Sequence, residues 1–118
     1  MTSMTSIQDA IEDMLTNVQL TVEEAIARHF VPSFRQRVNG AWLDQAGFEA
    51  RIAALRQMVD SVTITVLDEF FDSDRYAERH IIDIQKRDGD RIRQEVYLFA
   101  QRSQDGRFIR IEETTLTI

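Results

Sequence analysis

Cysteine is absent from this chain, and proline, histidine and tryptophan are scarce. Without cysteine there is no disulfide, no thiolate nucleophile and no cysteine-based metal site, which fits a reducing compartment. No apolar run approaches the ~20 residues needed to span a bilayer. The opening residues 1–6 lack the basic and apolar regions of a secretory signal. We therefore expect a cytoplasmic protein with no membrane partner.

An excess of positive charge is also missing. The net charge is −6, and the arginines are interleaved with acidic residues rather than gathered in a patch. Nucleic-acid binding depends on such a patch to neutralise phosphates, so no nucleic-acid partner is expected. No glycine-rich phosphate loop is present, and we expect neither a cofactor nor a metal. A length of 118 residues with 43% apolar composition predicts one domain, residues 1–118.

Helix signals fill the first half of the chain. Ser6 precedes apolar residues at spacings of three and four, which predicts an amphipathic helix with Ser6 as its N-cap. Thr21 and Glu24 form the pattern of a capping box and predict a second helix, which Pro32 stops. Asp44 caps a third helix. A short extended piece at 34–38 is possible before the Asn39-Gly40 turn.

Strand signals fill the second half. Strands are predicted at residues 62–70, 76–86, 91–102 and 108–118. The turns between them fall at Asp72-Ser73-Asp74, Asp88-Gly89 and Asp105-Gly106. The predicted fold class is therefore α+β, with three N-terminal helices packed on one face of a four-strand antiparallel meander.

The turns also predict which side chains share a face of the sheet. If Asp88-Gly89 and Asp105-Gly106 are two-residue type I′ turns, Arg79 lies opposite Leu98, and Leu98 lies opposite Glu113. This register places Arg79, Asp83 and Glu113 on the better apolar face, and the cross-strand pair His80 and Tyr97 on the other. A slip of one residue would exchange the two faces. Because buried charge is costly unless it is paired or used, Arg79 and Glu113 predict a pocket.

Each candidate site residue has two interpretations. Arg79 and Glu113 are either acid–base and ligand-polarising groups or a structural ion pair. His29 lies on the apolar stripe of its helix, where it either reaches the pocket mouth or is a satisfied core histidine. Trp42, the only tryptophan, is either a pocket lid or a packing residue. His80 with Tyr97 is interpreted as an interface pair on the outer face.

Several short motifs in order resemble the small bacterial SnoaL-like members of the nuclear transport factor 2-like superfamily. They are residues 25–32, Val38-Asn39-Gly40, and residues 48–56, 77–80 and 105–113, and together they cover nearly the whole chain. The resemblance implies a cystatin-like cone, in which a curved sheet wraps around a long helix and encloses a pocket. It also implies frequent dimerisation through the outer face of the sheet. Fold alone does not settle function, because cyclases, isomerases, dehydratases, hydrolases and binding modules share this shape.

The limonene epoxide hydrolase branch offers a comparison for the site. Its pattern begins as Glu78-Arg79-His80 does, but Ile81 stands where the first catalytic aspartate belongs. Glu113 stands at the place of the second. Epoxide hydrolysis in that branch needs both carboxylates, one to activate water and one to protonate the epoxide oxygen. Epoxide hydrolysis is therefore not expected here.

Two function hypotheses follow, and the sequence leaves open whether the chain is an enzyme. The first is a cofactor-free isomerase, cyclase or dehydratase in which Glu113 shuttles a proton and Arg79 stabilises negative charge. The second is a non-catalytic ligand-binding or dimeric assembly module with a structural Arg–Glu pair. Both expect a small apolar ligand and a homodimer formed through the outer sheet face. The predicted ligand-binding residues are His29, Trp42, Asp83 and Leu98.

Overall fold

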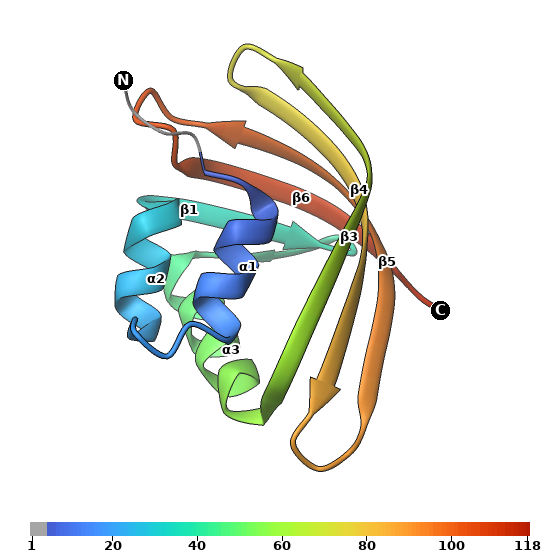
Figure 1. Cartoon of the computed structure of the whole chain (residues 1–118). Helices are drawn as coiled ribbons and strands as arrows, with labels where there is room; N and C mark the ends of the chain where they lie inside the picture. The colour runs from blue at the N-terminus through green and yellow to red at the C-terminus, as the bar shows by residue number, and fades with distance from the viewer. Residues whose placement is uncertain (1–4) are drawn as a thin grey trace.

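The computed structural model describes residues 5–118. Residues 1–4, which belong to the segment 1–6 in which no secretory signal is expected, lie outside the described residues. The helices are α1 (Ile7–Leu15), α2 (Val22–His29) and α3 (Gln45–Met58). The strands are β1 (Phe30–Val38), β2 (Ala41–Leu43), β3 (Val59–Asp72), β4 (Arg75–Lys86), β5 (Arg91–Arg102) and β6 (Phe108–Thr117). Figure 1 shows one curved sheet with the helices on its concave side, which confirms the predicted α+β class.

The sheet has six strands rather than the predicted four. Their order is β2-β1-β6-β5-β4-β3, and β1 runs parallel to β6 while all other neighbours are antiparallel. Sequence reasoning missed the start of β1 because Pro32 lies within it. The proline is tolerated because it falls where the β1–β6 register shifts, between Phe30 and Arg35. The Asn39-Gly40 turn is confirmed, with both residues at positive φ between paired strands β1 and β2.

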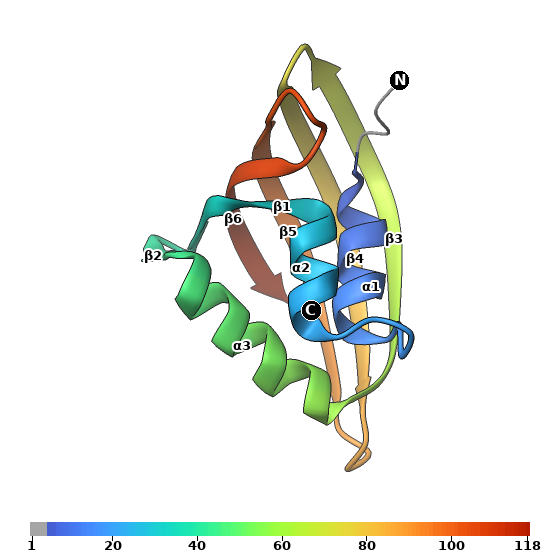
Figure 2. The same cartoon turned by 90° about the vertical axis from the view of Figure 1, so that its left-hand side faces the viewer.

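The helices begin where the sequence predicts. The Ser6 hydroxyl accepts the Asp9 amide, and the Asp44 carboxylate accepts the Gly47 amide at 2.9 Å. The Thr21–Glu24 capping box is complete in both directions. Figure 2 shows α1 and α2 side by side, with α3 running along their edge. Among the described residues, no helix is long and apolar enough to cross a membrane.

The predicted register between β4 and β5 is wrong by one residue. Arg79 pairs with Tyr97, and His80 pairs with Val96. The turn contains three residues instead of two, since the Lys86 amide bonds to the Asp90 carbonyl and Gly89 takes a positive φ of 96°. One extra turn residue moves every side chain of β4 to the opposite face relative to β5. Glu78, His80 and Ile82 therefore face the helices, and Arg79 and Asp83 face away.

The register between β5 and β6 is as predicted, with Leu98 opposite Glu113. The turn at Asp105-Gly106 is also longer than two residues, because the Ser103 amide bonds to the Arg107 carbonyl. Here a register shift between Gln101 and Arg102 compensates for the extra residue. Leu98 and Glu113 thus keep the face assigned to them.

A cluster of four phenylalanines fills one end of the space between helices and sheet. Phe30 contacts Phe34, Phe48 and Phe108, with ring centroids 4.5–5.8 Å apart. All four rings are buried. Packed aromatic rings of this kind contribute large apolar burial. They close this end of the cone and leave the space nearer α1 less completely filled.

Candidate functional site

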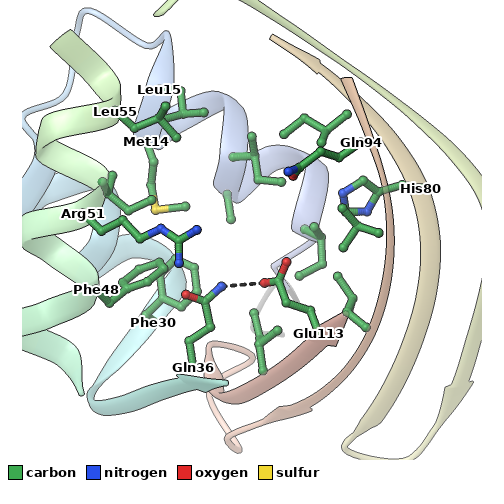
Figure 3. A pocket seen from close by; sticks show the side chains of 18 residues that line it. Met14, Leu15, Phe30, Gln36, Phe48, Arg51, Leu55, His80, Gln94 and Glu113 are labelled. Carbon is green, nitrogen blue, oxygen red and sulfur yellow. Dashed lines mark hydrogen bonds between the residues drawn. The ribbon is translucent and has the colours of Figure 1, made fainter. Parts of the chain in front are cut away.

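A cavity of about 140 Å³ lies between the concave face of the sheet and helices α1 and α3. Figure 3 shows its walls, which are mainly aliphatic and aromatic. Five polar side chains join them: Gln36, Arg51, His80, Gln94 and Glu113. An apolar cavity with a few converging polar groups is the usual form of a small-molecule site.

Glu113 enters the cavity from β6. Its carboxylate accepts a hydrogen bond from the Gln36 side-chain amide on β1 at 2.5 Å (Figure 3). Burial among apolar side chains raises the pKa of Glu113, and this effect exceeds the lowering by Gln36 and by the charges of His80 and Arg51. The protonated form of Glu113 is therefore favoured in comparison with a carboxyl in water.

His80 enters from β4 and is only 2% exposed. Its Nδ1 lies 2.6 Å from Oε2 of Glu78, which is also buried. The two residues are two positions apart on one strand, so both side chains point to the concave face. A carboxyl partner on Nδ1 fixes the orientation of the imidazole and leaves Nε2 for other contacts.

Arg51 and Gln94 complete the polar lining. Arg51 comes from α3, and Figure 3 shows its guanidinium reaching into the cavity on the side away from His80. Gln94 comes from β5 and lies near His80 in the same view. A cation, an amide, an imidazole and a carboxyl therefore surround one small apolar space.

Two of the six predicted site residues line this cavity, namely Glu113 and Leu98. Arg79 and Asp83 lie on the convex face instead, as the β4–β5 register requires. Arg79 Nε bonds Asp68 at 2.8 Å, and Asp83 bonds Arg91. The prediction that Arg79 and Glu113 form a pair is therefore wrong, because the two residues are on opposite faces of the sheet.

His29 and Trp42 lie away from the cavity. His29 is buried, with Nε2 2.6 Å from Asp13 and Nδ1 bonded to the Thr5 hydroxyl. Of the two interpretations of His29, pocket mouth or core, the structure supports a core histidine whose two ring nitrogens both have hydrogen-bond partners. Trp42 is 47% exposed on β2, where the Arg35 guanidinium lies 4.6 Å from its ring. It packs against that arginine and forms no wall of the cavity.

Sequence reasoning missed four of the polar lining residues. His80 was assigned to the outer face solely because of the β4–β5 turn, so the true turn length would have placed it correctly. Arg51 lies one residue before Ile52 of the apolar stripe, a weak signal that it borders the core face of α3. Gln94 alternates with Val96 and Leu98 along its strand, so the predicted register already places it on the face of the cavity. Gln36 carried no signal, since a glutamine in a strand is ordinary on a solvated face.

The described residues contain no group of three or more histidine and acidic side chains arranged to hold a metal. What the cavity offers is acid–base chemistry. Glu113 and His80 face one space, and a group between them could lose a proton to one and gain a proton from the other. The guanidinium of Arg51 could stabilise negative charge on the same molecule.

No protein-family model matches the sequence, and no curated protein sequence matches it. Solved structures do match. A proposed isomerase from Rhodopseudomonas palustris superposes with a TM-score of 0.73 at 11% identity, over 92% of this chain and 84% of that one. IdmH, a proposed polyketide cyclase from Streptomyces antibioticus, gives a TM-score of 0.69 at 14% identity, over 92% and 88% of the two chains.

A third neighbour carries the family name itself. A proposed isomerase of the SnoaL-like family from Agrobacterium tumefaciens superposes with a TM-score of 0.65 at 14% identity, over 92% of each chain. At such low identity the likeness concerns the fold. The chain therefore has the fold of these SnoaL-like and isomerase-like structures, which is the fold that the motifs predict.

Proposed function

We propose that this protein is a cofactor-free proton-transfer enzyme of isomerase or cyclase type, acting on a small, mostly apolar carbonyl compound. One observation carries the proposal: a carboxyl with a raised pKa, Glu113, shares an apolar cavity with a carboxyl-bound imidazole, His80. The fold neighbours proposed to be isomerases and a polyketide cyclase support the reaction class.

We assign His80 the role of general base because of its hydrogen bond with Glu78. With the Nδ1 proton donated to Glu78, a neutral imidazole has its lone pair on Nε2. The ring lines the cavity, so Nε2 is the nitrogen available to a ligand. Glu113 takes the part of the acid, because burial favours its protonated form.

The reaction then proceeds by enolisation. His80 Nε2 removes a proton from a carbon next to the substrate carbonyl, and the C–H electron pair forms a C=C bond. The carbonyl π electrons move to the oxygen, which takes the proton of Glu113. His80 is left as an imidazolium and Glu113 as a carboxylate. Return of the two protons with one on a different carbon gives an isomer. Attack of the enol carbon on a second carbonyl carbon gives a ring: the enol proton returns to Glu113, and the imidazolium proton goes to the oxygen of the second carbonyl.

The other polar residues have supporting parts. The Gln36 amide holds the Glu113 carboxyl at 2.5 Å. The Arg51 guanidinium stabilises negative charge on the substrate oxygen, a part that the sequence had suggested for Arg79. Arg51 also balances the carboxylate of Glu113 after it has given up its proton.

The size of the cavity limits the substrate. A dry protein cavity of ~150 Å³ is known to accept benzene, and this one has about 140 Å³. A single six-membered ring therefore fits inside. Larger substrates must place one ring in the cavity and extend past its rim.

The test is deuterium uptake in D₂O by the carbons adjacent to the carbonyl of cyclohexanone and of cyclohexenone, followed by NMR. We expect the protein to accelerate uptake, and Glu113→Gln or His80→Asn to reduce the rate ~10²-fold or more. Glu112→Gln is the matched control, since Glu112 neighbours Glu113 but pairs with Arg37 and Arg110 instead. Equal rates in all four proteins would contradict the proposal, and binding without uptake would favour the non-catalytic alternative.

A second copy of this chain is the partner that best fits the convex face. That face exposes Phe70, Phe99 and Leu116, which are 57–72% accessible. Phe70 and Phe99 both flank Ala77 across neighbouring strands. Arginines and acids surround them, as in the Arg79–Asp68 pair. A face that carries both signs of charge can be complementary to itself across a two-fold axis.

A further inference from the structure

Three side chains continue from His80 away from the cavity toward the end of the β3–β4 hairpin. Glu78 bonds His80 Nδ1 through Oε2, at 2.6 Å, and the Tyr76 hydroxyl through Oε1. The same hydroxyl lies 2.9 Å from Oε2 of Glu69. His80, Glu78 and Tyr76 are buried, and Glu69 is exposed. An unbroken line of hydrogen bonds therefore runs from the cavity wall to the surface.

The sheet itself holds this line in place. Tyr76, Glu78 and His80 alternate along β4 and so share its concave face. Glu69 is the β3 residue directly opposite Glu78. Residues opposite each other on antiparallel strands point to the same face. The end of the β3–β4 hairpin extends beyond the helices in Figure 1. Glu69 on this hairpin is exposed to solvent.

Counting protons limits the directions that the hydrogen bonds of this line can take. Tyr76 has one hydroxyl proton but contacts two carboxyl groups, so one of the carboxyls must donate to it for both contacts to be hydrogen bonds. Burial and the neighbouring acids raise the pKa of Tyr76, so it remains a phenol. With the extra proton on Glu78 Oε1, His80 donates to Glu78, Glu78 donates to Tyr76, and Tyr76 donates to Glu69. All donors then point outward.

Charges face both ends of the line. The Arg102 guanidinium on β5 lies 4.8 Å from the centre of the Tyr76 ring and donates to the Thr5 carbonyl. Its positive charge acts on the Tyr76 hydroxyl and on the carboxyl groups of Glu69 and Glu78. At the other end, Glu113 from β6 and Arg51 from α3 face the cavity with His80. The line therefore connects two regions whose charges are compensated separately.

We infer that Glu78, Tyr76 and Glu69 form a proton relay that connects His80 in the cavity to solvent at β3. A proton received at Nε2 allows Nδ1 to pass its own proton to Glu78 Oε2. Glu78 then passes its Oε1 proton to Tyr76, and Tyr76 passes its hydroxyl proton to Glu69, which releases it to water. His80 is left neutral with the proton on Nε2. Its use in turnover rests on the proposed function, because the relay returns His80 to the neutral state whenever the imidazolium does not give its proton back to the product.

The relay is tested without any substrate, by NMR measurement of the exchange rate of the His80 ring N–H with water. A buried N–H with no relay exchanges only when the structure opens locally. Glu69→Gln keeps an acceptor for Tyr76 but cannot take up and release a proton. We therefore expect Glu69→Gln and Tyr76→Phe each to slow exchange at least about tenfold relative to the unmodified protein.

Two controls make the outcome decisive. Asp68→Asn removes an exposed acid next to Glu69 that bonds Arg79 outside the line, and it should leave the exchange rate unchanged. Glu113→Gln should reduce deuterium uptake by the ketones while the His80 ring N–H still exchanges through the line, so the relay and the proposed function can fail separately. Exchange that is equally fast in Glu69→Gln and in the unmodified protein, with matching amide spectra, would overturn the relay.

Discussion

Glu113 is surrounded by apolar side chains in a cavity that also contains the imidazole of His80, so its charge state affects the fold as well as the chemistry. Burial raises the pKa of Glu113 above that of the unfolded chain. A carboxyl of this kind contributes most to stability below its unfolded pKa, and the contribution is lost as the pH rises through its folded pKa. At pH values above its unfolded pKa, Glu113 therefore lowers the stability of the folded protein relative to a neutral side chain at the same position.

Glu113→Gln should raise the melting temperature at about pH 8, and the gain should disappear toward about pH 4, where the carboxyl is protonated in both states. The glutamine oxygen can still accept the Gln36 amide, so this hydrogen bond is kept. Thermal unfolding followed by circular dichroism over that pH range measures the effect. A gain that is the same at every pH would show that ionisation of Glu113 is not its cause.

At the scale of elements, Arg56 of α3 holds the helices together. Its guanidinium donates to three carbonyls at and after the end of α1, those of Met14, Asn17 and Leu20. The contact with Asn17 is 2.8 Å. Met14 is in the last turn of α1, where carbonyls lack a partner inside the helix, and Asn17 and Leu20 lie in the connection to α2. Arg56 thus fixes α3 against the α1–α2 connection, and with it one wall of the cavity.

Arg56→Met should keep most of the packing of the side chain but lose all three hydrogen bonds. We expect it to lower the free energy of unfolding by about 1–3 kcal/mol, the range for hydrogen bonds to a charged group. Urea denaturation measures the change. Arg28→Met on α2 is the control, because Arg28 is half exposed and pairs with Asp13 at 3.5 Å, and its loss should cost less than about 1 kcal/mol.

The helices and most of the sheet could be predicted, because caps and alternation are local signals. The starts of the three helices could be predicted from their N-cap residues, which are Ser6, Thr21 and Asp44. Only residues 34–38 of β1 could be predicted, because its pairing partner, β6, lies about 75 residues away along the chain and Pro32 argues against a strand before them. The wrong faces predicted for Arg79, His80 and Asp83 have one cause. The sequence Asp88-Gly89 fits turns of two or three residues, and only the second places His80 inside.

At the scale of the whole molecule, the convex face and the cavity are separate surfaces of one sheet. The proposed dimer uses side chains such as Phe99, whereas the cavity uses their neighbours on the same strand, such as Leu98. Alternation along β5 therefore allows the two functions to be changed independently.

Phe99→Glu should convert the proposed dimer to a monomer, because it places a charge among the exposed apolar side chains of the convex face. Light scattering after size exclusion measures the mass. Val18→Glu, at an 87% exposed position away from the sheet, should leave the mass unchanged. If the protein with Phe99 intact is already monomeric at high concentration, the dimer proposal is wrong.

The three-residue turn at Gly89 has a consequence for how this protein can evolve. Loops usually accept insertions and deletions at little cost. Deleting one residue here and restoring a two-residue turn would turn β4 over relative to β5, moving Arg79 and Asp83 toward the helices and His80 and Glu78 toward water. The length of this surface loop is therefore inherited as part of the site. Relatives whose loop is one residue shorter or longer would carry a different set of chemical groups on the same scaffold.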